Sequence, residues 1–404
     1  MSLKTRFVRS WGQLGMKYKW TIKTLSDIAD FNPRESLSKG TLAKKIAMDK
    51  LQPFCRDVPS FELEKFSGGT KFRNGDTIMA RITPCLENGK TAKVNILDDG
   101  EIGFGSTEYI VFRAKKGTDK DYLYYLVCSP LVREPAIKSM VGSSGRQRVQ
   151  TDVVQGLSIA VPSIEEQRQI GGILRALDDK IELNNEINKN LEEQAQSIFA
   201  NEFLSLDTLP EGWKQASLID IADYLNGLAM QKYRPTADES GIPVLKIKEL
   251  RQGCCDDNSE LCSPSIKSDY IIHDGDVIFS WSGSLLVDFW CGGTCGLNQH
   301  LFKVTSNIYD KWFYYSWTNY YLQKFAAIAA DMATTMGHIK REELAKSRVL
   351  IPSNSDYECI GGLLAPLYNL VISNRIENSK LATIRDTLLP KLMSGEVDVS
   401  NLDL

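Results

Sequence analysis

Two polar segments of the chain combine small residues with basic and amide side chains. The first, "GSSGRQRVQ", contains Arg146, Gln147 and Arg148, and the second, "TTMGHIKRE", contains His338 and Lys340. Arginine donates through a planar fork that fits an anionic group at two points, and lysine brings a mobile point charge. Both segments are therefore candidates for contact with a polyanion.

The sequence lacks the short motifs of common nucleotide-using and DNA-modifying enzymes. "FNPRES", at Asn32-Pro33-Arg34, lacks the aromatic residue of N-P-P-Y, and neither G-x-x-x-x-G-K-[ST] nor G-x-S-x-G occurs. "GFGS", at 103–106, lacks the third glycine of a dinucleotide site. The pair Asp178 and Lys180 has nuclease-like D-x-K spacing, but it falls inside a helical pattern and predicts a solvated helix face. We expect no catalytic residue in this chain.

The sequence offers few sets of residues that could ligate a metal ion. Structural zinc needs four ligands, and the first half of the chain has no cysteine set to match that of the second half. The three histidines, His273, His300 and His338, have no partner at a recognised ligand spacing. The sequence therefore predicts no metal site, and the C-x3-C spacing of Cys291 and Cys295 leaves a zinc site as the alternative. The crowded cysteines are Cys254, Cys255, Cys262, Cys291 and Cys295.

Composition narrows the class of protein. With 43% hydrophobic and 25% charged residues, the chain has the make-up of a soluble globular protein. No apolar run reaches membrane-spanning length, and the first residues do not have the pattern of a signal peptide. Nine cysteines, an odd number, favour reduced thiols. We expect a cytoplasmic protein with no membrane partner.

The chain is an internal duplication. "VPSIEEQRQIGGIL" (161–174) returns as "IPSNSDYECIGGLL" (351–364), and the same shift of 190 aligns Tyr124 with Tyr314 and Phe112 with Phe302. "LSDIADF" matches "LIDIADY" at a shift of 193, and Gly75-Asp76 matches Gly275-Asp276 at a shift of 200. Loop lengths therefore vary between the copies. So long a period predicts two similar domains.

Each copy ends in a long amphipathic helix. Ser163 with Glu166, and Ser353 with Asp356, form capping boxes that start the helices, and the first helix is expected from about 164 to 200. Apolar residues then recur at alternating steps of four and three, which is the seam of a coiled coil, so we expect the two helices to pack on each other. The seam residues are Ile170, Leu174, Leu177, Ile181, Asn184 and Leu191 in the first helix, and Leu364, Leu367, Val371, Asn374 and Leu381 in the second.

Polar and small residues interrupt both seams at equivalent steps. Asn184 and Asn374 would fix the register of pairing, because a shifted pairing leaves a buried amide unsatisfied. The alternative is that they lie at a wet edge. Gly171 and Gly361 open two glycine pairs, Gly171-Gly172 and Gly361-Gly362, that weaken the helix, and close approach of another backbone or fraying of the first turn would explain them.

Outside these helices the two domains look like mixed α/β folds. The expected strands are "DTIMARI", "EYIVFRA" and "LSIAVP" in the first copy, and "PVLKIK", "DVIFSW" and "HLFKVT" in the second. Residues 121–140 and 310–332 have helical spacing of aromatic and aliphatic side chains, which are expected to be core.

This constellation resembles the DNA sequence-specificity subunit of type I restriction-modification systems. The resemblance rests on the repeated opening W-…-L-x-D-I-A-D, the G-D-x-I strand, the V/I-P-S capping box with its heptad helix, and the ending "LLPKLMSGEVDV". The second copy departs from it, because Asp356-Tyr357 replaces Glu166-Gln167. The resemblance implies a first target recognition domain over 1–162, a central spacer helix over 163–204, a second recognition domain over 205–352 and a C-terminal spacer helix over 353–404. The two spacers would pair antiparallel.

The resemblance also implies the role and the partners. The chain would recognise an asymmetric two-part sequence in double-stranded DNA, one part per domain, without being an enzyme itself. Two modification subunits holding S-adenosylmethionine would methylate adenine, and restriction subunits using ATP and Mg²⁺ would translocate and cleave the DNA. This chain would need no cofactor of its own.

The charge of the chain is segregated in a way that permits DNA binding. The formal net charge is −3, yet residues 1–60 hold 12 Lys and Arg against 5 Asp and Glu, whereas residues 165–200 hold 8 acidic against 4 basic residues. Lysines and arginines expected to contact phosphate are Lys71, Arg73, Lys90, Lys93, Lys232, Arg234 and Lys340. Side chains expected to contact base edges are Arg146, Gln147, Arg148, Ser282, Ser284 and His338. For each of these, a solvated surface side chain is the alternative.

Two other classes of protein remain as alternatives. A scaffold protein would use the coiled coil and bind proteins through its α/β lobes, and it would have no salt-dependent affinity for DNA. A self-contained DNA-modifying enzyme would turn over DNA with a methyl donor or a divalent metal.

Overall fold

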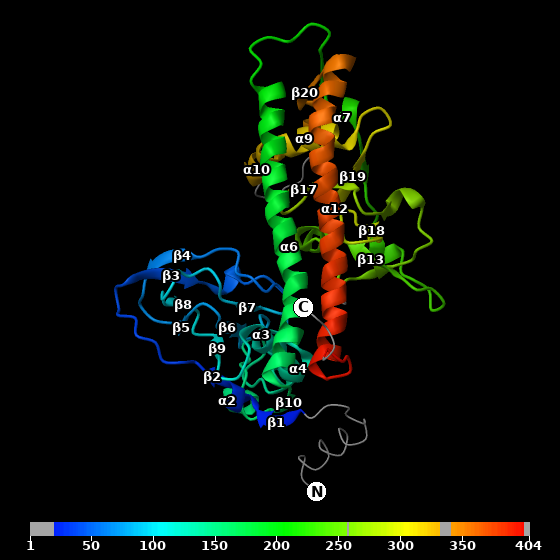
Figure 1. Cartoon of the computed structure of the whole chain (residues 1–404). Helices are drawn as coiled ribbons and strands as arrows, with labels where there is room; N and C mark the ends of the chain where they lie inside the picture. The colour runs from blue at the N-terminus through cyan, green and yellow to red at the C-terminus, as the bar shows by residue number, and fades with distance from the viewer. Residues whose placement is uncertain (1–19, 257, 332–340, 400–404) are drawn as a thin grey trace. The chain divides into compact units, whose positions relative to one another are not determined.

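The computed structural model describes residues 20–256, 258–331 and 341–399, which fall into two compact units (Figure 1). Unit 1 comprises residues 20–182 and 381–399, and unit 2 comprises the described residues from 183 to 380. Each unit combines one lobe with part of both long helices, α6 (Ile164–Phe199) and α12 (Asn354–Met393). Within the described ranges, no helix is long and apolar enough to cross a membrane.

The lobe of unit 1 is a mixed α/β structure. Its strands are β1 (Thr21–Thr24), β2 (Ala29–Phe31), β3 (Leu42–Ile46), β4 (Glu62–Lys65), β5 (Thr70–Phe72), β6 (Thr77–Ala80), β7 (Thr91–Lys93), β8 (Gly103–Gly105), β9 (Tyr109–Ala114) and β10 (Ser158–Val161). Its helices are α2 (Leu25–Ile28), α3 (Lys120–Cys128), α4 (Pro130–Lys138) and α5 (Thr151–Gln155), with a 3-10 turn at Met48–Lys50.

The lobe of unit 2 repeats this order. Its strands are β11 (Lys214–Ser217), β12 (Asp223–Asn226), β13 (Ile242–Leu245), β14 (Leu261–Cys262), β15 (Ile271–Ile272), β16 (Val277–Ser280), β17 (Leu286–Phe289), β18 (Cys295–Leu297), β19 (Leu301–Thr305) and β20 (Arg348–Ile351). Its helices are α7 (Leu218–Ile221), α8 (Ile247–Gln252), α9 (Lys311–Tyr320), α10 (Leu322–Asp331) and α11 (Arg341–Ala345). Shorter turns lie at Ala200–Leu204, Met230–Lys232 and Ser268–Tyr270.

The sheets of the two lobes have the same topology. Unit 1 has a two-stranded sheet β1-β10 and two four-stranded sheets, β2-β9-β6-β7 and β4-β3-β8-β5. Unit 2 has β11-β20, β12-β19-β16-β17 and β14-β13-β18-β15. The parallel pair β3–β8 recurs as β13–β18, and the other described pairs are antiparallel. The predicted duplication and the mixed α/β class are therefore confirmed.

The register of the strands corrects one detail of the internal alignment. Ile110 lies opposite Met79 in unit 1, and Phe302 lies opposite Phe279 in unit 2. Phe302 is thus the counterpart of Ile110, not of Phe112 as the shift of 190 predicts. Strand pairing moves the correct shift at this strand to 192, because the loops between the anchors differ in length.

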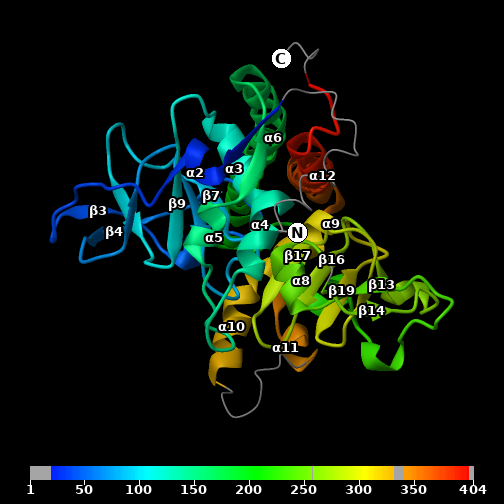
Figure 2. The same ribbon diagram turned by 90° about the horizontal axis from the view of Figure 1, so that it is seen from below.

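One hydrophobic cluster in each unit joins a sheet to the long helices. In unit 1 it contains Phe112 of β9, Tyr122 of α3, Ile170 of α6 and Leu392 of α12. In unit 2 it contains Phe279 of β16, together with residues of α9, Phe199 of α6 and Leu364 of α12. Figures 1 and 2 both place β3 and β4 at the end of unit 1 farthest from its part of α6. The β2-β9-β6-β7 sheet is therefore the one that packs toward the helices.

The two stretches with helical spacing of apolar residues each contain two helices. Residues 121–140 divide into α3 and α4 at Ser129, which has an extended backbone (φ −68°, ψ 157°). The residue before a proline avoids the helical region, and Pro130 follows Ser129. Residues 310–332 divide at Tyr321 into α9 and α10. The expected strand "PVLKIK" is also shorter than predicted, because β13 ends at Leu245 and α8 begins at Ile247.

The capping box of α6 forms as predicted, because the Glu166 carboxylate accepts the Ser163 backbone N–H at 2.9 Å. At the start of α12 the Asp356 carboxylate accepts the Ser353 hydroxyl at 2.8 Å instead. The backbone N–H of Glu166 donates to Ser163 Oγ at 3.2 Å, and that of Asp356 donates to Ser353 Oγ at the same distance. The indole N–H of Trp20 donates to the Glu166 carboxylate, and that of Trp213 donates to the Asp356 carboxylate. These tryptophans precede β1 and β11. Each lobe is thus tied to the start of its own long helix.

Tyr357 stands where the first copy has Gln167, and it keeps the equivalent hydrogen bond to the aromatic helix. In unit 1, Gln167 Oε1 accepts the backbone N–H of Asp119, the N-cap of α3, at 3.0 Å. In unit 2, the Tyr357 hydroxyl accepts the backbone N–H of Asp310, the N-cap of α9, at 2.8 Å. Both side chains serve the start of the aromatic helix, so the hydrogen bond persists without the glutamine.

Close approach explains two of the helix glycines. A Cβ on Gly171 would lie 2.8 Å from the backbone nitrogen of Tyr122, and one on Gly361 would lie 3.0 Å from the indole nitrogen of Trp312. Both glycines therefore let an aromatic helix approach. A Cβ on Gly362 would meet nothing within 4 Å, so close approach does not account for that residue.

Buried asparagines join α6 and α12 within unit 2. The Asn184 amide donates to Asn378 at 2.8 Å and to Glu377 at 2.7 Å, and the Asn374 amide donates to Asn188 at 2.9 Å. Asn184 and Asn188 are only 1% and 5% exposed. The order of these partners makes the two helices antiparallel. A shift of one turn would leave the amides without their partners, which is the cost expected for a register device.

The expected seam positions all face inward. Ile170, Leu174, Asn184, Leu364, Val371 and Asn374 are buried, and Leu177, Ile181, Leu191, Leu367 and Leu381 are half-buried. In unit 1 the seam also contains an ion pair, because Arg385 Nη1 of α12 lies 2.7 Å from Asp178 Oδ1 of α6.

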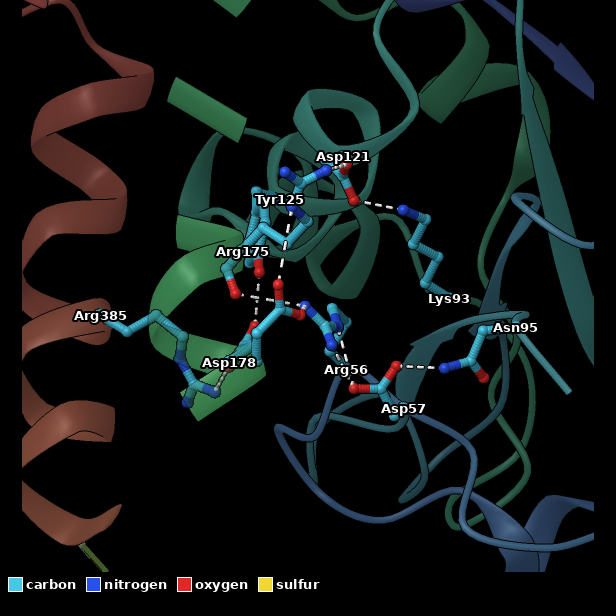
Figure 3. A network of polar contacts seen from close by, with 10 residues as sticks. Arg56, Asp57, Lys93, Asn95, Asp121, Tyr125, Arg175, Asp178 and Arg385 are labelled. Atoms are coloured by element: carbon cyan, nitrogen blue, oxygen red, sulfur yellow. Dashed lines mark hydrogen bonds and ion pairs between the residues drawn. The ribbon is translucent and has the colours of Figure 1, made fainter. Parts of the chain in front are cut away.

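Asp178 is the centre of a polar network in unit 1 (Figure 3). It accepts the Tyr125 hydroxyl of α3 at 2.6 Å as well as the Arg385 guanidinium. Its side chain is 5% exposed, so the solvated helix face predicted for Asp178 is wrong. Beside it, Arg56 from the loop before β4 bonds Asp57 and Asp179, each at 2.6 Å. The network therefore joins the lobe to both long helices.

Replacing one asparagine of the seam and replacing all four should have opposite effects on the stability of the chain. Asn188→Leu should lower the free energy of unfolding by about 1–3 kcal/mol, because the buried Asn374 amide would no longer have its acceptor. Replacing Asn184, Asn188, Asn374 and Asn378 together by leucine should raise the melting temperature, since it also removes the buried Asn184 carbonyl oxygen, which lacks a partner among the described residues. Thermal unfolding measures both, with the exposed Asn190→Leu as control. A quadruple variant less stable than the wild type would contradict the seam.

The ion pair at Asp178 predicts a compensating pair of variants. Asp178→Asn should destabilise the chain, because Arg385 keeps a largely buried charge. The destabilisation should fall below the roughly 3–5 kcal/mol of a fully isolated buried charge, because Arg385 also pairs with Asp386. Adding Arg385→Met should restore most of the stability. Denaturant unfolding of the single and double variants tests this, and equal stability of wild type and Asp178→Asn would refute it.

Candidate nucleic-acid interface

The segment "GSSGRQRVQ" forms a short hairpin on the lobe of unit 1. Val141 and Arg148 pair at its base, with backbone hydrogen bonds of 3.0 and 2.9 Å. Gly142 and Gly145 have positive φ values of 132° and 75° within the turn, which glycine adopts without strain. Arg146 is exposed at this tip, and its guanidinium has no partner among the described residues.

The hairpin is fastened to the segment that follows β6. Thr83 donates its backbone N–H to the Gln147 carbonyl at 3.0 Å, and Thr83 Oγ1 accepts the Gln147 N–H at 2.8 Å. Arg148 also forms an antiparallel bridge with Ile82. The Arg81 N–H donates to the carbonyl of Glu108, just before β9, at 2.9 Å. Three segments distant in sequence therefore meet at one place.

An ion pair lies at this junction. Arg148 Nε lies 3.0 Å from both oxygens of the Glu108 carboxylate, and Arg148 Nη2 lies 2.7 Å from Oε1. The hydrogen bond from Arg148 lowers the pKa of Glu108, so the carboxylate is ionised at neutral pH. Arg81, Glu108, Gln147 and Arg148 are called the Arg148 cluster below.

Unit 2 has a corresponding junction with different side chains. The strand registers make Trp281 the counterpart of Arg81 and His300 the counterpart of Glu108. The Trp281 indole donates to Asn226 Oδ1 at 3.1 Å, and Ser282 Oγ lies 3.2 Å from His300 Nδ1. Gln299 Nε2 lies 3.4 Å from His300 Nε2. These five residues, Asn226, Trp281, Ser282, Gln299 and His300, are called the Trp281 cluster.

The basic residues expected to contact phosphate have varied surroundings in unit 1. Lys71 donates to the Glu35 carbonyl at 2.9 Å, and Arg73 binds the Glu35 carboxylate through Nε and Nη2 at 2.7 and 2.8 Å. Lys90 donates to the carbonyl of Met48. Lys93 pairs with Asp121 in the network of Figure 3. Arg73 and Lys93 are thus neutralised by carboxylates, whereas Lys71 and Lys90 donate to backbone carbonyls and have no carboxylate partner among the described residues.

The remaining expected contacts lie in unit 2 or outside the described residues. Lys232 is exposed without a side-chain partner among the described residues, whereas Arg234 pairs with Glu260. Ser282 is buried in the Trp281 cluster, and Ser284 is exposed nearby. His338 and Lys340 lie outside the described residues. The structure therefore brings Gln147 and Arg148 together and sets Ser282 beside His300.

Sequence reasoning missed Glu108, Asn226, Trp281, Gln299 and His300. The shift of 200 that aligns Gly75-Asp76 with Gly275-Asp276 also aligns Arg81 with Trp281, so a comparison of the residues that follow the repeated strand could have found that pair. His300 and Glu108 required the strand register. Across the described chain, no group of three or more His, Cys, Asp or Glu side chains is placed to hold a metal ion.

Comparisons with known proteins agree with this architecture. The family model for the type I restriction modification DNA specificity domain matches the chain twice, over residues 17–193 and 210–384. The specificity subunit of the type I restriction enzyme MjaIX of Methanocaldococcus jannaschii is 26% identical over 312 residues, which is 71% of each chain. The EcoAI specificity subunit of Escherichia coli is 33% identical over 159 residues, 38% of this chain and 26% of its own.

A solved structure shares the fold. It is the S subunit of a type I restriction-modification system from M. genitalium, which superposes with a TM-score of 0.55 at 16% identity, covering 94% of this chain and 97% of its own. The family model covers both copies of the duplicated unit and well over half of the sequence. The chain therefore belongs to the type I restriction-modification DNA specificity family.

Proposed function

We propose that this specificity protein directs a type I restriction-modification complex to an asymmetric two-part DNA sequence, with one part contacted by each lobe. The observation that carries the proposal is the pair of junctions. One fold occurs twice, and at the same place it presents Arg81 and Glu108 in one lobe and Trp281 and His300 in the other. The two lobes have the same backbone fold but different side chains at this junction. Such a pair of surfaces suits a DNA target whose two halves differ in sequence.

The two clusters offer complementary kinds of contact with DNA. Arginine and glutamine suit the acceptor and donor patterns of guanine and adenine, and the Arg148 cluster holds both. The Trp281 cluster offers an aromatic ring with amide, imidazole and hydroxyl groups. Phosphate contacts come from basic side chains with no acidic partner in the described chain, Lys232 foremost. Their role is to position the protein, since phosphates carry no sequence information.

The chain acts as the aiming component of a larger assembly. Two modification subunits using S-adenosylmethionine methylate adenine in the recognised sequence, and restriction subunits using ATP and Mg²⁺ translocate and cleave DNA. The chain itself supplies recognition, needs no cofactor and works in the cytoplasm. The family match supports this assignment, together with the two lobes built on paired helices.

Methylation mapping tests the function directly. The chain is co-expressed with its modification subunit, and methylated adenines are sequenced in the DNA of the expressing cell. The expected result is one asymmetric two-part motif, of which only one part changes when residues 20–160 are exchanged for those of another family member. Cells lacking the chain serve as control. If no complex and no motif appear, a scaffold role replaces this proposal.

Arginine replacement in the hairpin should affect one half of the target. The double variant Arg146→Ala, Arg148→Ala should weaken binding by about 1–3 kcal/mol for each base pair that the hairpin no longer reads. Equilibrium binding of the complex to duplexes altered in either half measures this, and the second half-site is the control within the same molecule. Unchanged binding would remove the hairpin from the interface.

A further inference from the structure

Arg148 has a fixed backbone on the surface of the first lobe. Its N–H and C=O exchange hydrogen bonds with Val141, and it forms a second bridge with Ile82. The next residue, Val149, donates to the Arg81 carbonyl at 2.8 Å. A side chain on a backbone held in this way has less conformational freedom to lose on binding than one at an open loop tip.

The side chain of Arg148 is also oriented. Glu108 occupies Nε and one hydrogen of Nη2, and Nη1 has no partner among the described residues. The side chain is 47% exposed, whereas that of Glu108 is 24% exposed. The guanidinium therefore keeps a free edge formed by Nη1 and Nη2. Two parallel N–H groups match the O6 and N7 acceptors of guanine in the major groove.

A surface that only bound phosphate would not be expected to carry the negative charge of Glu108. A carboxylate near DNA repels the phosphates and lowers affinity for any sequence. The hydrogen bonds from Arg148 keep the pKa of Glu108 below its ordinary value, so this repulsion persists at neutral pH. A gain in selectivity through the geometry of Arg148 would offset the lower general affinity.

Among the described residues of the second lobe, the corresponding place has different side chains. His300 replaces Glu108 and bonds Ser282 and Gln299 rather than an arginine. Trp281 replaces Arg81 and bonds Asn226. Among the described residues of this junction, no carboxylate is set to orient a guanidinium. The arginine–glutamate pair is therefore a property of the first lobe rather than of the shared fold.

We propose that Glu108 is the positioning residue that aims Arg148 at a guanine in the half-site contacted by the first lobe. The proposal rests on the proposed function and deepens it, since it assigns a base and a mechanism of selection to one residue pair. Glu108 acts through Arg148 and touches no base. Its contribution is selectivity, and it lowers affinity for unrelated DNA.

The test uses the complete complex of the chain with its modification subunits. Wild type and Glu108→Ala are titrated with duplexes carrying the mapped motif, with every single base-pair change in the first half-site, and with an unrelated duplex. In the variant, discrimination at one G·C pair should fall about tenfold. Affinity for the unrelated duplex should stay equal or rise, because a negative charge has been removed.

Three companion variants separate positioning from a general defect. Glu108→Gln keeps an acceptor oxygen without the charge, and it should retain an intermediate discrimination at the same base pair. Arg148→Ala should abolish that discrimination, and adding Glu108→Ala to it should cause no further decrease, as expected when one residue acts through the other. Discrimination within the second half-site should be unchanged in all of them.

The results distinguish a failure of the role of Glu108 from a failure of the proposed function. Full discrimination in Glu108→Ala, a first half-site with no G·C pair, or an equal decrease in both half-sites would each overturn the role of Glu108. In those cases a wild-type complex that still methylates a two-part motif leaves the proposed function standing. A wild-type complex without any motif overturns both.

Discussion

The structure depends on the fact that each long helix has an apolar stripe which it cannot bury alone. In unit 2 the stripes of α6 and α12 meet, and two asparagine pairs across them make other registers costly. In unit 1 the same helices are joined by Asp178 and Arg385, with Tyr125 of the lobe as a third partner. The lobes are then anchored to these helices by matched contacts, such as those of Trp20 and Trp213. Each lobe is thus anchored to the long helices within its own unit.

Features set by local rules could be predicted from the sequence. The helix expected from about 164 to 200 spans Ile164–Phe199, because a capping box and a periodic seam are both local signals. The duplication followed from the repeated motif, and the sheet topology repeats with it. Apolar spacing predicts helix in residues 121–140 but not the break at Ser129, which follows from the effect of Pro130 on the preceding residue.

Features set by tertiary contact could not be predicted in the same way. Asp178 looked solvated because its partners, Tyr125 and Arg385, are 53 and 207 residues away. Glu108 meets Arg148 only because β9 pairs with β6 and the hairpin pairs with Ile82. Composition identified the hairpin as basic, but it could not reveal that a carboxylate holds Arg148 while Arg146 has no side-chain partner among the described residues. These contacts join segments far apart in the sequence, and each segment contributes only one partner.

The asparagine register has one more consequence. Under the shift of 190, Asn374 is the copy of Asn184 and Asn378 is the copy of Asn188, so the pair Asn184–Asn378 and the pair Asn188–Asn374 are the same contact seen from opposite sides. An interface that maps onto itself in this way is isologous, the kind on which two-fold symmetric dimers are built. The two asparagine contacts within unit 2 therefore have the form of a symmetric interface, although they join two segments of one polypeptide. The side chains of the two lobes can differ, as Arg81 and Trp281 do, without a change in these asparagine contacts.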